Sequence, residues 1–177
     1  VSLSDYDLSF DLKDEMSELI GVLTPEIIRT NRKKISRHFS SILLAPFASN
    51  AMTIMFEICE PIDEDNLPKT LIGCFIPETN KMRFLLRNLS VHQNSVCVHS
   101  LKALDQAQKE LYRLKNDYPE LYQYLEPKHI IALKWGVLFH DLGKIDPHAD
   151  HEVFGTSVAV QALEKIGYKD QELFTLV

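Results

Sequence analysis

The adjacent pair His140-Asp141 is the place in this sequence where residue types and position best suit chemistry. It follows residues 130–139, which are apolar at every position except Lys134 and therefore predict a helix buried on most sides. A carboxylate at the end of such a helix is doubly disfavoured, because burial penalises its charge and the helix C-terminus is partially negative. A divalent metal ion compensates the carboxylate charge and so offsets both costs, and its usual ligands include neutral imidazole and ionised carboxylate. His99, near the start of another predicted helix, is a third candidate ligand.

The rest of the chain must position these residues, and its pattern is helical almost throughout. Glycine is scarce, with 6 residues, and the alternation typical of strands hardly occurs. Thr24-Pro25, Asp150 and Gly167 have the residue types of helix caps and ends. The expected helices cover residues 11–20, 25–45, 49–59, 95–115, part of 116–128, 130–139, 151–166, and one that begins at 170. The sequence therefore predicts an all-α fold.

Composition excludes several classes of protein. The chain has 177 residues and a net charge of −6, so a basic coat over the whole surface is not expected, although a local basic stripe remains compatible with it. Three cysteines at no metal-ligand spacing favour a reducing, cytoplasmic setting over a disulfide scaffold. No apolar run is long enough to cross a bilayer and no signal-peptide pattern opens the chain, so neither a membrane protein nor a secreted one is expected.

The segment His140-Asp141-Leu142-Gly143-Lys144 resembles the signature of the HD-domain family of metal-dependent phosphohydrolases, with His99 earlier and Asp150-His151-Glu152 later in the chain. The resemblance implies that His99, His140 and Asp141 bind a divalent ion such as Mg²⁺, Mn²⁺ or Ni²⁺. It implies catalytic roles for Lys144, at a substrate phosphate, and for His151, near the phosphate or a second metal. It also implies a further aspartate ligand on a later helix, which we assign to no residue of this chain. The alternative to this resemblance is that the His-Asp pair occurs by chance and that its side chains are simply hydrogen-bonded within the core.

The N-terminal half resembles the neck of bacterial CCA-adding enzymes and poly(A) polymerases. The resemblance rests on Leu8-Ser9-Phe10-Asp11-Leu12, on Ile42-Leu43-Leu44-Ala45-Pro46 and on Phe75-Ile76-Pro77-Glu78, whereas Lys33-Lys34 departs from the family pattern. It implies a neck and body at residues 1–90 and an HD domain, incomplete at its C-terminus, at 91–177. The nucleotide-transferring head is expected to be absent, because no glycine-rich turn with a paired Asp-x-Asp occurs in this chain.

Four cations recur at three- and four-residue steps in the predicted helix 25–45: Arg29, Arg32, Lys33 and Arg37. They are candidates for contacts with RNA phosphates, and the alternative is a solvated helix surface. The partners expected from the resemblance are tRNA or a phosphorylated nucleotide. Two other functions stay open: the HD region of a nitrogen-regulatory uridylyltransferase that removes uridylyl groups, and a helical module that binds RNA or a protein without catalysis.

Overall fold

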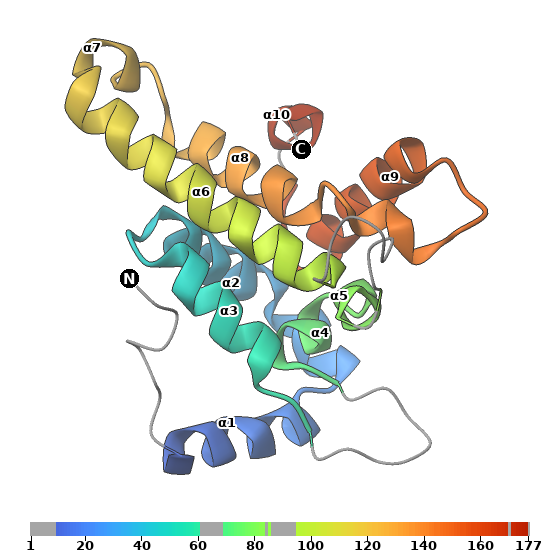
Figure 1. The fold of residues 1–177 in the computed structure, drawn as a ribbon. Coiled ribbons are helices and arrows are strands. Elements are labelled where there is room, and N and C mark those ends of the chain that lie inside the picture. The colour runs from blue at the N-terminus through green and yellow to red at the C-terminus, as the bar shows by residue number, and fades with distance from the viewer. Residues whose placement is uncertain (1–9, 61–68, 84, 86–94, 170, 177) are drawn as a thin grey trace.

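The computed structural model describes residues 10–60, 69–83, 85, 95–169 and 171–176 (Figure 1). Within these ranges the chain is mostly helical, and an isolated antiparallel bridge joins Cys59 to Thr70. The predicted all-α class is confirmed. The helices are α1 (Phe10–Val22), α2 (Pro25–Leu44), α3 (Ala48–Glu57), α4 (Leu71–Phe75), α5 (Glu78–Met82), α6 (Val96–Asp117), α7 (Pro119–Tyr122), α8 (Pro127–Phe139), the 3₁₀ turn η2 (Leu142–Ile145), α9 (His151–Lys165) and α10 (Gln171–Leu176).

Capping residues set the starts of the long helices. The hydroxyl of Thr24 accepts a hydrogen bond from the backbone N–H of Ile27 and caps the start of α2. The hydroxyl of Ser95 accepts one from the backbone N–H of Val98 and caps the start of α6. The Asp150 carboxylate accepts from two backbone N–H groups in the first turn of α9. The predicted caps at Thr24 and Asp150 are therefore confirmed. At the far end of α9, Gly167 takes a φ of +107°, a left-handed conformation that favours glycine.

Two short helices, α4 and α5, were not predicted. Each has only five residues, which is too short for a hydrophobic period to show. A tertiary hydrogen bond stabilises this region, because the Asn80 side-chain oxygen accepts from both the backbone N–H and the hydroxyl of Thr70. Thr70 in turn accepts from the N–H of Gly73 and caps α4. The acidic segment at 60–65 and the domain boundary at residue 90 lie, except for Glu60, outside the described residues.

The core is centred on α8, which packs against α2, α6 and α10. Trp135 is fully buried, and its ring lies 5.5 Å from that of Phe39 on α2 and 4.9 Å from that of Phe139. Phe39 also meets Phe75 of α4 edge-on at 5.4 Å. Aromatic contacts therefore join helices from both halves of the chain into one core. The predicted burial of the 130–139 helix is confirmed on most sides, although Leu133 is 43% exposed.

Lys134, the single polar residue of that helix, is buried with the rest, at 3% exposure. Its ammonium donates to the backbone carbonyl of Leu43, at the last turn of α2, over 2.6 Å. This carbonyl has no partner within its own helix, so the lysine both satisfies it and joins α8 to α2.

The helix α6 runs beside α8 in Figure 1, so that the start of α6 lies near the end of α8. The turn η2 and the helix α9 continue from that end and pack closely against each other. The residues of chemical interest gather where these four elements meet. None of the described helices is long and apolar enough to cross a membrane.

Candidate metal centre

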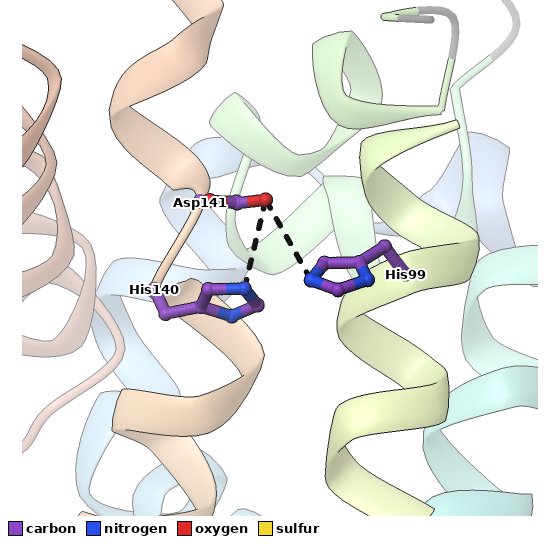
Figure 2. A group of neighbouring side chains, drawn as sticks. All are labelled: His99, His140 and Asp141. Carbon is purple, nitrogen blue, oxygen red and sulfur yellow. Dashed lines mark ion pairs between the residues drawn. The ribbon is translucent and has the colours of Figure 1, made fainter. Parts of the chain in front are cut away.

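The three predicted metal ligands come together at one place. His99 lies in the first turn of α6, and His140 and Asp141 directly follow the last residue of α8. The two imidazole Nε2 atoms approach the same Asp141 oxygen, Oδ2, at 3.9 Å for His99 and 3.5 Å for His140. Figure 2 shows both rings turned toward this oxygen from opposite helices. The centroids of the two imidazole rings are 5.0 Å apart.

The backbone orients the ring of His140. Its Nδ1 lies 2.7 Å from the carbonyl oxygen of Val137, one turn earlier in α8. A carbonyl can only accept a hydrogen bond, so Nδ1 donates to it and Nε2, the nitrogen on the side of Asp141, is the ring atom that could bind a metal ion. Metal-binding histidines are commonly held by such a bond at the second nitrogen.

The carboxylate of Asp141 is the buried member of the group, with a side chain only 7% exposed, against 34% for His99 and 37% for His140. Its two oxygens face different groups. Oδ1 lies 2.6 Å from the ammonium of Lys144, one turn further along in η2, while Oδ2 faces the imidazoles. The lysine offsets part of the cost of burying the carboxylate charge. The resemblance to the HD-domain family implied a role for Lys144 at a substrate phosphate. Its contact with Asp141 was not predicted, although the i, i+3 spacing is a signal for it.

The group has the chemistry and the dimensions of a cation site. One ligand atom from each of His99, His140 and Asp141 lies within 4.8 Å of the others. Divalent ions hold nitrogen and oxygen at about 2.0–2.2 Å, so two ligands of one ion are about 3.0–4.4 Å apart, depending on their angle. The separations of 3.5 and 3.9 Å fall within this range. Two imidazoles and one carboxylate suit several divalent metals and do not select one. These three residues could hold a metal ion.

His151, the fifth predicted residue of the site, stands exposed at the first position of α9. It does not belong to the group of potential ligands found among the described residues. Its backbone, however, lies against the site, since a Cβ added at Gly143 would stand 1.8 Å from the carbonyl oxygen of His151. The catalytic role of its side chain stays a prediction.

The four basic residues of α2 are exposed and lie apart from the potential metal ligands in the sequence. Arg29 forms an ion pair of 2.7 Å with Glu26, and the Nε of Arg37 donates to the backbone carbonyl of Lys33. Arg32 contributes its backbone carbonyl to the surroundings of Gly167. Their exposure fits both the RNA contact and the solvated surface that the sequence left open.

Sequence reasoning missed a pocket beside the metal-ligand group. It lies between α8 and α9, has a volume of about 380 Å³, and includes His140 in its wall. Gly136 and Glu152 also line it. A glycine within a helix is the one signal in the sequence that could have pointed to an opening at this place.

Comparisons with protein-family models, curated proteins and solved structures find no match to this chain. The fold and the site define an all-α protein that carries a two-histidine, one-aspartate group able to hold a metal ion.

Proposed function

We propose that this chain is a metal-dependent phosphohydrolase of the HD type, within a protein resembling CCA-adding enzymes and poly(A) polymerases. The observation that carries the proposal is the convergence of His99 on His140-Asp141 from a separate helix. A chance His-Asp pair has no reason to meet a second imidazole across the fold. The cytoplasmic location expected from the sequence is part of the proposal, and it is supported by three cysteines present as free thiols.

His99, His140 and Asp141 would hold the divalent ion. When bound, such an ion acidifies a water molecule toward neutral pH and neutralises charge on phosphoryl oxygens. The protein's own part is to orient His140 through the Val137 carbonyl and to present the Asp141 carboxylate in a fixed direction. Lys144 is 32% exposed at its side chain, so its ammonium can reach a phosphate oxygen while it stays beside Asp141.

The test is a measurement of metal affinity and of hydrolysis on the same variants. Asp141→Asn keeps the shape of the side chain and removes its charge, so we expect Co²⁺ affinity, read from the visible absorption of the bound ion, to fall by about 100-fold or more. Hydrolysis of bis-p-nitrophenyl phosphate and of cyclic AMP should fall with it. Glu164→Gln, which removes one exposed carboxylate from α9, is the matched control. Equal rates for wild type and Asp141→Asn would remove the hydrolase proposal.

The exposed cations of α2 support a second element of the proposal, which is contact with the tRNA backbone. Replacing Arg29, Arg32, Lys33 and Arg37 by glutamine should weaken tRNA binding and flatten its salt dependence, by about 0.7–0.9 in log–log slope per lost phosphate contact. The control replaces four exposed cations of α6, namely Lys102, Lys109, Arg113 and Lys115. If both sets of changes have the same effect, the α2 surface is simply a solvated one.

A further inference from the structure

The pocket between α8 and α9 offers space for more than a metal ion and a phosphate. Its volume of about 380 Å³ lies within the range of small-molecule sites. His140 lies both in this wall and in the group of potential metal ligands, so a molecule in the pocket lies beside a residue whose Nε2 faces Asp141. The pocket therefore borders the place where the reacting phosphate would sit.

Gly136 stands in the interior of α8 and lines this pocket. A glycine inside a helix destabilises it by about 0.5–1 kcal/mol relative to alanine. The other glycine of the wall, Gly155, has a different reason for its identity, because its Cβ would stand 3.0 Å from the backbone nitrogen of Gly143. Gly136 leaves room along α8 where any other residue would project a side chain.

The two sides of the pocket differ in chemistry. Leu133, Val137 and Ala159 supply apolar surface. Glu152, in the first turn of α9, supplies a carboxylate whose charge is favoured there by the helix dipole. A carboxylate accepts hydrogen bonds and does not donate them, and the apolar wall offers a surface against which a ring can pack.

We infer that this pocket, with Gly136 and Glu152 as its specificity-determining residues, binds the organic group of the phosphoester substrate, and that this group is a flat ring bearing an amino donor. The inference rests on the proposed hydrolase function and adds the class of substrate. The ring packs against the apolar wall beside His140, along the space left by Gly136, and its amino group donates to Glu152. The phosphate is then directed toward Lys144 and the potential metal ligands.

The experiment measures binding of 2-aminopurine riboside monophosphate through its fluorescence, which falls when the base stacks. Gly136→Leu should weaken binding by about 100-fold or more, because its side chain fills the pocket. Gly136→Ala should weaken it about tenfold and yet raise the melting temperature, since alanine favours the helix. Loss of affinity in a more stable protein is an effect that damage to the fold does not produce.

Glu152→Gln tests the amino contact separately. Wild type should prefer the aminopurine probe over the purine probe that lacks the amino group by about tenfold, the usual worth of a hydrogen bond to a charged group. Glu152→Gln should reduce this preference to less than about threefold. Co²⁺ affinity, measured in parallel, should be the same in both variants of Gly136, in Glu152→Gln and in wild type.

Two results overturn the inference. If wild type binds Co²⁺ and hydrolyses phosphoesters but Gly136→Leu binds the probe as well as wild type, the hydrolase proposal stands and the pocket assignment fails. If wild type shows no preference for the amino-bearing probe, the role of Glu152 fails. Failure of the hydrolase proposal itself is seen independently, as absent Co²⁺ binding and absent hydrolysis in wild type.

Discussion

At the scale of single residues, Asp141 links two kinds of contact. One carboxylate oxygen accepts a hydrogen bond from the Lys144 ammonium and the other faces two imidazoles, so the charge of this buried side chain is compensated on one side and lies beside two potential metal ligands on the other. The sequence predicted the three potential ligands, because residue type and a buried preceding helix are visible in it. The orientation of each oxygen was not predictable, since it depends on the tight turn of η2 after α8.

Lys134 is a second buried charge, and its effect on stability should depend on pH. Burial lowers the pKa of its ammonium from 10.5 to about 8. Between pH 8 and 10.5 the unfolded chain therefore holds a proton that the folded protein has lost, and the free energy of unfolding rises with pH. Below pH 8 both states are protonated and the cost of the buried charge, on the order of 3 kcal/mol, is felt in full.

Lys134→Met keeps the length of the side chain and removes the charge. We expect it to be more stable than wild type at pH 7 by about 1–2 kcal/mol, after loss of the hydrogen bond to Leu43 is included, and this advantage should disappear by pH 10. Urea unfolding at a series of pH values measures it. The difference between the two proteins isolates Lys134 from Cys97 and Tyr168, whose raised pKa values act in the opposite direction. A difference that stays constant from pH 7 to 10 contradicts the prediction.

At the scale of elements, the site depends on how closely η2 packs against α9. A Cβ at Gly143 would stand 1.8 Å from the carbonyl oxygen of His151 and 2.8 Å from the backbone nitrogen of Gly155. These are backbone atoms, so they can move away only if α9 moves as a whole. Gly143 does not have a positive φ, so its backbone conformation does not require glycine. Glycine is favoured here because a side chain would collide with the backbone of α9.

Gly143→Ala should destabilise the protein by about 1–3 kcal/mol and weaken Co²⁺ binding, since the displaced turn carries Asp141 at its start and Lys144 within it. The control is Gly21→Ala in α1, where a Cβ meets nothing within 4 Å and the helix should gain about 0.5–1 kcal/mol. Chemical denaturation and a Co²⁺ titration measure both quantities. Equal stability of Gly143→Ala and wild type would show that α9 can move without cost.

The long helices were predictable from the sequence because their signals are local. Thr24 with Pro25, and Asp150 before α9, are side chains that satisfy the first backbone N–H groups of a helix. The short helices α4 and α5 were not predictable, since Asn80 stabilises them through a contact with Thr70 across the turn. The pocket between α8 and α9 was not predictable from the sequence either, because it arises from the packing of two helices.

At the scale of the whole molecule, the potential ligands join parts of the chain that are far apart in sequence. His99 lies on α6 and His140-Asp141 follows α8, with α7 between the two helices. The unfolded chain holds these side chains far apart on average, so an ion that needs all three binds the folded state. Binding to the folded state alone adds about 2.7 kcal/mol of stability when the free ion is at 100 times its Kd.

We therefore expect a divalent ion at that concentration to raise the melting temperature by about 5–10 °C, given a shift of about 2–4 °C per kcal/mol for a chain of this size. EDTA should reverse the rise. His99→Ala removes the one ligand from α6, so the ion should no longer link α6 to the end of α8 and the shift should fall below about 2 °C. His38→Ala, which changes an exposed histidine of α2, should leave the shift unchanged and excludes general binding to surface histidines. If His99→Ala keeps the full shift, the ion binds elsewhere and α6 has no part in the site.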